Sequence, residues 1–125
     1  MAIENPNVID MISGDNASPC VRLIMLEYRE WEMTPERLGQ LESKISAYFN
    51  YTASGQLAKD QPNADNLPLF IELHCAYRPP EKMIGLFSQA GDLFEKLRAV
   101  FVVYQIDYLE EEPQRVKVFD SRGAE

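Results

Sequence analysis

The stretch CVRLIMLEY, residues 20–28, decides the fold class more than any other part of this 125-residue chain. It is apolar almost without interruption from Val21 to Leu26. A strand with one face in water alternates apolar and polar residues, whereas a strand covered on both faces does not. We therefore place this strand inside a sheet, and its neighbours have to come from the rest of the chain.

Four other segments are typical of strands. Residues 69–77 alternate, with Leu69 and Ile71 on one side and Phe70 and Glu72 on the other. Residues 100–109 are rich in β-branched and aromatic side chains, and residues 8–12 form a short apolar run. The alternation around Val116 indicates a further strand at the edge of the sheet, hairpinned onto residues 100–109.

Two helices are predicted between these strands. Thr34, Pro35 and Glu36 suit the cap and first turn of a helix that ends at Gly55, with Lys44 on a face away from its apolar stripe. The second helix runs from about 80 to about 98, with a break at Gly91 as the alternative.

The order of these elements, β-β-α-β-α-β with a possible last strand, predicts an α+β fold. We expect four or five mostly antiparallel strands with both helices packed on one face. The length fits a single domain over 1–125, with an ordered core of about 5–119 and a frayed tail at 120–125. The polar stretch 56–67 is predicted to be a long surface loop.

Charge and composition exclude several partners. The net charge is −8 and no segment gathers the cations into a stripe, so we expect neither nucleic-acid nor membrane binding. No signal peptide or membrane-spanning run is visible, and Cys20 and Cys75 have no metal-ligand spacing. These features predict a cytoplasmic protein with two buried thiols and no cofactor.

No enzyme motif stands out, which favours a non-enzymatic protein. His74 and Cys75 are neighbours in a strand, so they point to opposite faces and cannot share a proton. A small-molecule or metal-binding site, catalytic or not, remains an alternative that would use Glu72 and His74 with Asp10 or Asp107.

The preferred interpretation is an interaction or accessory module. A sheet with two apolar faces and helices enough for one usually buries the other against a second subunit, so we predict a homodimer or an unidentified protein partner. Candidate contact residues are Trp31, Phe70, His74 and Tyr28.

Three alternatives remain open. The segment 56–67 and the C-terminus could cover the second face of the sheet within the monomer. Trp31 could be a lid on the core instead of a binding anchor. An acidic mimic of nucleic acid, or a protein that neutralises a basic toxin, would instead need a clustered acidic stripe.

The opening NPNVID, residues 5–10, resembles the start of a family of small bacterial proteins known only as a domain of unknown function. The acidic segment around Trp31, the helix from Pro35 through Tyr48, the Ser54-Gly55-Gln56 exit and the strand around Ile71 are also similar to that family. The resemblance covers residues 5 to about 108. It implies a bacterial, cytoplasmic α+β domain and carries no activity or functional residues.

Overall fold

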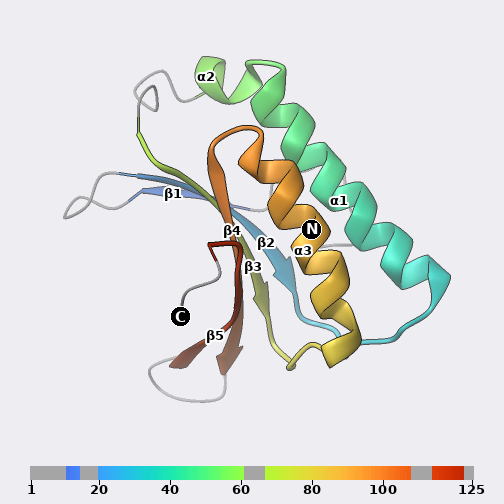
Figure 1. Ribbon diagram of the computed structural model, residues 1–125. Coiled ribbons are helices and arrows are strands. Elements are labelled where there is room, and N and C mark those ends of the chain that lie inside the picture. The colour runs from blue at the N-terminus through green and yellow to red at the C-terminus, as the bar shows by residue number, and fades with distance from the viewer. Residues whose placement is uncertain (1–10, 15–19, 61–66, 108–113, 123–125) are drawn as a thin grey trace.

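The computed structural model describes residues 11–14, 20–60, 67–107 and 114–122 (Figure 1). Its elements in chain order are β1 (Met11–Gly14), β2 (Val21–Glu27), α1 (Pro35–Ala53), α2 (Gln56–Asp60), β3 (Leu69–Cys75), the 3-10 turn η2 (Glu81–Met83), α3 (Ile84–Glu95), β4 (Ala99–Asp107) and β5 (Gln114–Asp120). The predicted α+β class is thus confirmed, and the predicted strands and two long helices follow one another as expected, with α2 and η2 in addition. The predicted first strand lies partly outside the described residues, which begin at Met11.

The five strands form one sheet in the order β1-β2-β3-β4-β5. β1 and β5 are antiparallel to their neighbours, but β2, β3 and β4 run parallel to one another. The prediction of a mostly antiparallel sheet is therefore wrong at its centre. The reason is that α1 connects β2 to β3 and α3 connects β3 to β4, and such a helical crossover returns the chain to start a parallel strand.

Both long helices lie on the same side of the sheet, as predicted (Figure 1). They cover a core in which Leu23, Ile71 and Phe101 stand in register across β2, β3 and β4. Phe87 and Phe94 of α3 pack on Phe101 with ring centroids 6.2 and 5.7 Å away. Among the described residues, no helix combines the length and apolar character needed to cross a membrane.

Helix α1 begins and ends where the sequence predicts. The Thr34 hydroxyl accepts a hydrogen bond from the Arg37 amide at 3.2 Å, and Gly55 takes a φ of 89°, which glycine adopts without strain. Lys44 contradicts the prediction, because it is fully buried, with its Nζ 5.6 Å from the centre of the Tyr48 ring. Its long aliphatic stem makes such packing feasible.

The segment predicted as a long loop starts with a helix instead. Residues Gln56–Asp60 form α2, which buries Leu57. The Tyr51 hydroxyl donates to Oδ2 of Asp60 at 2.7 Å and ties α2 to α1, and burial together with Asp60 raises the pKa of Tyr51 to about 12. The apolar contact of Leu57 overrides the polar composition of this stretch. Residues 61–66 lie outside the described part of the chain.

Helix α3 continues through Gly91 without the break that we considered. Gly91 is buried where the helix crosses the end of β5, so that a Cβ added there would lie 2.8 Å from the Cβ of Ser121. Ser121 cannot easily retreat, because its amide donates to the Phe101 carbonyl at 2.8 Å and its hydroxyl accepts from the Phe101 amide at 2.9 Å. The glycine therefore permits close packing of α3 on the sheet.

We expect Gly91→Ala to lower the free energy of unfolding by about 1–3 kcal/mol, because the new methyl group overpacks the contact with Ser121. Gly39→Ala is the matched control, since Gly39 lies inside α1 with nothing within 4 Å of an added Cβ. That control should gain up to about 1 kcal/mol from helix propensity. Urea unfolding of both variants measures the difference, and equal effects would contradict the close packing.

Candidate functional site

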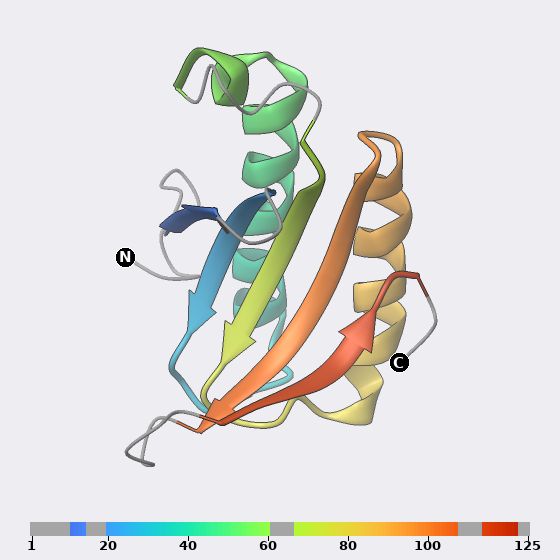
Figure 2. The ribbon, with the colours of Figure 1, turned by 90° about the vertical axis from the view of Figure 1, so that its left-hand side faces the viewer.

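The side of the sheet away from α1 and α3 carries ionisable and aromatic side chains from four strands. None of the described helices lies in front of it in Figure 2, and we call it the helix-free face. Alternate residues of each strand point to it. Its described members are Arg22, Ile24, Leu26, Phe70, Glu72, His74, Val100, Val102, Tyr104, Ile106, Arg115, Lys117, Asp120 and Arg122.

Glu72 lies at the centre of this face, in register with Ile24 and Val102, and is only 3% exposed. Its Oε1 is 2.8 Å from Nε2 of His74 and 4.0 Å from Nη1 of Arg22. A buried carboxylate is costly unless it is paired and hydrogen-bonded, and these two neighbours meet that need. The Glu72–His74 contact therefore has a structural explanation, since it stabilises a buried carboxylate, and it does not by itself indicate a catalytic role.

A second buried carboxylate, Asp120, stands in register with Val102 at the end of β5. The Arg122 side chain donates to it twice, from Nε to Oδ1 at 3.0 Å and from Nη2 to Oδ2 at 2.7 Å, and its backbone amide donates to Oδ1 at 2.9 Å. Lys117 donates from Nζ to Oδ2 at 3.0 Å. The hydrogen bonds from Arg122 are the main cause that holds the pKa of Asp120 well below its usual range, against the opposing effect of burial. Asp120 is thus a fixed negative charge shared by two cations.

Aromatic rings and cations are interleaved on the same face. The His74 ring packs edge-on against Tyr104, with centroids 5.6 Å apart, and the Arg115 guanidinium lies 4.5 Å from the centre of the Tyr104 ring. The Arg122 guanidinium lies 5.8 Å from the centre of the Phe70 ring. Such contacts hold the cations over the rings. The described cations of the helix-free face are Arg22, Arg115, Lys117 and Arg122, and its described carboxylates are Glu72 and Asp120. Cations thus outnumber carboxylates on this face, although the whole chain has a net charge of −8.

Of the predicted contact residues, Phe70 and His74 lie on the helix-free face, whereas Trp31 packs against the core on the helix side. Trp31 lies after β2, packs edge-on against Phe87 and donates from its indole nitrogen to the Tyr77 carbonyl at 2.9 Å. These contacts place it as a lid on the core, although an interaction role for its partly exposed ring stays a prediction. Tyr28 is 52% exposed just beyond the end of β2.

The structure brings together two of the four groups in the alternative metal or acid/base site. Glu72 and His74 meet, but Asp107 is exposed at the end of β4 and alternates to the other face, and Asp10 lies outside the described residues. Among the residues that the structure describes, no three His, Cys, Asp or Glu side chains gather closely enough to hold a metal ion. Cys75 is fully buried on the helix side, and burial raises the pKa of its thiol well above the usual range.

A shallow groove of about 550 Å³ opens at the start of α1 and is lined by Arg29, Glu30, Trp31, Glu32 and Arg37. Beneath it lies Glu27, which is 2% exposed. Arg29 donates to both of its carboxylate oxygens at 3.0 Å, and Nη2 of Arg37 lies 3.5 Å from Oε2. The arginines are therefore engaged in holding a buried carboxylate at the carboxyl end of β2.

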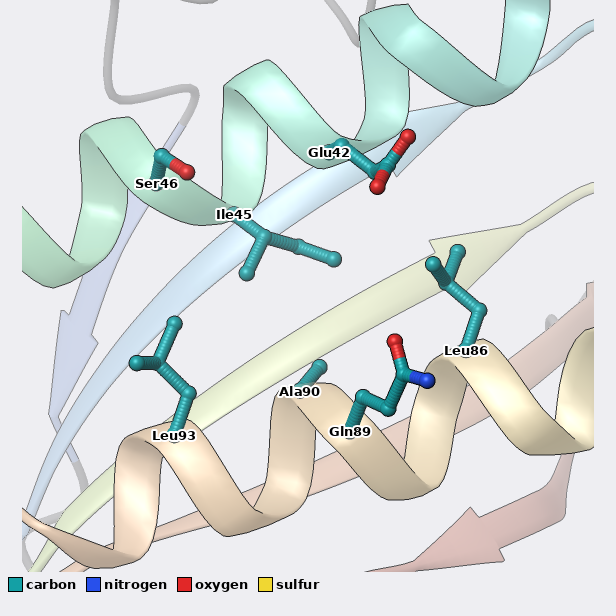
Figure 3. Close-up of a pocket in the computed structure, with 7 residues that line it drawn as sticks. All are labelled: Glu42, Ile45, Ser46, Leu86, Gln89, Ala90 and Leu93. Atoms are coloured by element: carbon teal, nitrogen blue, oxygen red, sulfur yellow. The ribbon is translucent and has the colours of Figure 1, made fainter. Parts of the chain in front are cut away.

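A second, smaller groove of about 150 Å³ lies between α1 and α3 (Figure 3). Ile45, Leu86 and Leu93 point into it from the two helices, and Glu42, Ser46 and Gln89 also line it (Figure 3). Its lining has no ionisable group besides Glu42, so the groove suits an apolar group and lacks a set of catalytic residues. Neither groove includes Glu72 or His74.

The residues that sequence reasoning missed are Asp120 and Arg122, which we placed in a frayed tail. The structure instead binds them into the sheet, where Asp120 is buried. The available signal was the alternation of Arg115 and Lys117 with Val116 and Val118, which predicted the strand but not the ion pairs at its end.

Comparison with known families gives one match. A model described as "Family of unknown function (DUF6572)" matches residues 1–107, which include β1 to β4 and end before β5. No curated protein and no solved structure matches the chain.

Replacing Asp120 by Asn should reduce stability in a pH-dependent way. The folded-state pKa of Asp120 is depressed, so its ion pairs stabilise the fold above the unfolded-state pKa and lose that effect as the pH falls through the folded-state value. We expect the parent to exceed Asp120→Asn by about 1–3 kcal/mol in the free energy of unfolding at neutral pH. Below about pH 4 the difference should shrink. Urea unfolding at several pH values measures it, and a constant difference would contradict the assignment.

Glu27 and Glu32 provide a matched pair, because each contacts Arg37 but their side chains are 3% and 63% exposed. Glu27→Ala leaves two arginines without their buried acceptor, and we expect a loss of about 3–5 kcal/mol. Glu32→Ala should cost no more than about 1 kcal/mol, because exposed ion pairs contribute little. Thermal or urea unfolding compares them, and similar losses would show that burial of Glu27 is not what matters.

Proposed function

The chain belongs to the family of unknown function DUF6572, and we propose that it is a non-enzymatic interaction module that acts as a homodimer through its helix-free face. The observation that carries the proposal is the one-sided placement of the helices. Both lie behind the sheet in Figure 2. The helix-free face keeps four partly exposed apolar residues, Leu26, Phe70, Val100 and Tyr104. Apolar patches of this kind commonly mark association surfaces.

The apolar part of this face is smaller than the sequence suggests. Ile24 and Val102, which point to this face, are only 3% and 1% exposed within the chain. Phe101 and Val103 face the helices instead. Contact with a second copy would therefore centre on Phe70 and Tyr104, with polar groups around them, as in the mixed interfaces of non-obligate complexes.

The state of the ionisable groups favours binding over catalysis. Glu72 is engaged by His74 and Arg22, and Asp120 by Lys117 and Arg122, so each carboxylate is already satisfied within the chain. A general acid or base has to reach a substrate proton from a site with room for that substrate. The described grooves lie elsewhere on the molecule.

The acidic-mimic interpretation has less support. At the start of α1 the exposed acids Glu30, Glu32 and Glu36 are interleaved with Arg29 and Arg37 and do not form a continuous stripe. On the helix-free face the described cations outnumber the carboxylates. Neither of these two surfaces therefore supplies the clustered acidic stripe that a mimic of a phosphate backbone needs.

Light scattering over a wide concentration range tests the homodimer. We expect the parent to approach twice the chain mass of 14.3 kDa as its concentration rises. Phe70→Glu should remain at the monomer mass, because it places a carboxylate in the apolar centre of the contact. The matched control is Ile84→Glu, which adds the same charge at a residue 40% exposed on α3 and should dimerise like the parent.

Circular dichroism verifies that both variants fold. A parent that stays monomeric at every concentration contradicts the homodimer, and so does a control that dissociates together with Phe70→Glu.

A further inference from the structure

The outer edge of β5 is the longer of the two edges of the sheet. β5 spans Gln114–Asp120, whereas β1 at the opposite edge spans Met11–Gly14. One side of the β5 backbone pairs with β4, and in the described part of the chain β5 is the last strand on its side (Figure 2). The outward side of such a strand presents backbone groups that another strand can pair with.

The two faces of β5 carry different kinds of side chain. Arg115 and Lys117 are exposed on the helix-free face, in register with Ile106 and Tyr104. Val116 lies between them on the opposite face, in register with Gln105, and is 52% exposed. The edge therefore reads, residue by residue, as cation, apolar side chain, cation.

The cations are held in place by their neighbours. Arg115 lies over the Tyr104 ring, while Lys117 and Arg122 share the single carboxylate of Asp120. Two cations on one carboxylate leave this cluster with a net positive charge, and Arg115 adds to it. Pre-positioned charges bind with less loss of side-chain entropy than free ones.

We propose that the outer edge of β5 binds an extended segment of a partner protein in which acidic residues alternate with apolar ones, so that the segment adds a sixth strand to the sheet. Backbone hydrogen bonds would supply much of the affinity, and the alternation would supply the specificity. Residues of an added strand alternate between the faces, so its acids would meet Arg115 and Lys117 while an apolar residue covers Val116.

A second copy of this chain fits the edge poorly. If two β5 strands paired antiparallel with Val116 opposite its counterpart, Arg115 would stand opposite the Lys117 of the other copy. Like charges directly opposite each other destabilise a pair of strands. The charges along the β5 edge therefore disfavour pairing with a second β5 strand and favour pairing with a strand that carries acidic residues. The net charge of −8 does not prevent this, because salt screens charges beyond about 8 Å under physiological conditions.

A nucleic acid would use only part of this surface. Its phosphates would contact the cations, but it would leave Val116 and the strand edge without a partner.

The matched family residues end at 107, so the edge of β5 belongs to a part of the chain outside that match. The proposal does not depend on the homodimer, because an added strand lies in the plane of the sheet and not on its helix-free face.

Fluorescence anisotropy with labelled peptides tests the proposal on the full chain. The probe is a peptide of alternating Glu and Val, and its controls are a peptide of the same composition with Glu and Val in separate blocks and a peptide of alternating Lys and Val. We expect the alternating Glu–Val peptide to bind at least about tenfold more tightly than either control. Amide chemical-shift changes on binding should concentrate on β5.

Charge reversal then locates the site. Arg115→Glu combined with Lys117→Glu should weaken the Glu–Val peptide by at least about tenfold and strengthen the Lys–Val peptide. Arg115→Glu alone leaves the Lys117–Asp120 pair intact and should show the same trend, should the double variant be unstable. The matched control, Lys59→Glu with Lys96→Glu, makes the same change of charge at exposed positions outside the sheet and should bind like the parent.

Four results would overturn the proposal: no binding of the Glu–Val peptide, equal binding of the alternating and block peptides, equal loss in the control variant, or tighter binding of a labelled oligothymidine than of any peptide. The parent's solution mass, measured separately, reports on the homodimer. A failed peptide experiment is therefore distinguishable from a failed homodimer.

Discussion

The parallel pairing of β2, β3 and β4 is the constraint on which the rest of the structure depends. Each parallel step requires a crossover, and crossovers of L-amino-acid chains are right-handed in nearly all cases. Since the strands follow one another in the same direction across the sheet, two right-handed crossovers place α1 and α3 on the same face. The helix-free face is therefore a consequence of topology.

That face solves a problem that the topology creates. Strands covered on one side only need a second side that tolerates water, and here the central row alternates apolar with carboxylate residues: Ile24, Glu72, Val102 and Asp120. Each carboxylate is contacted by cations or a histidine that reach it from neighbouring positions. The ion pairs account for buried acids on an uncovered sheet, because an unpaired buried charge would be far more costly.

The sequence was informative where one local signal decided the outcome. The cap at Thr34 and the positive φ of Gly55 set the limits of α1, and alternation predicted β3 and β5. The sequence was uninformative where contacts between residues distant in the chain decide the structure. Parallel pairing leaves little local trace, and α2 depends on one apolar contact of Leu57.

The same reasoning explains why the predictions for some single residues were wrong. Lys44 is buried although charged residues seldom are, and the salt bridge between Asp120 and Arg122 joins two residues that we assigned to a frayed tail. At the candidate site, the sequence identified Phe70, Glu72 and His74 but could not show that Asp107 faces the other way. It also could not show that Arg122 reaches Phe70.

The character of the helix-free face also bears on how any contact through it would behave. Permanent subunit interfaces resemble a protein core cut in half, whereas weaker ones are more polar. Ile24 and Val102 are already buried in the single chain, so association would remove little further area of theirs from water. The area that remains, around Phe70 and Tyr104, is bordered by Arg22, Arg115 and Arg122, whose desolvation opposes association. A face of this composition suits a contact that forms and dissociates with concentration, and a chain that folds without it.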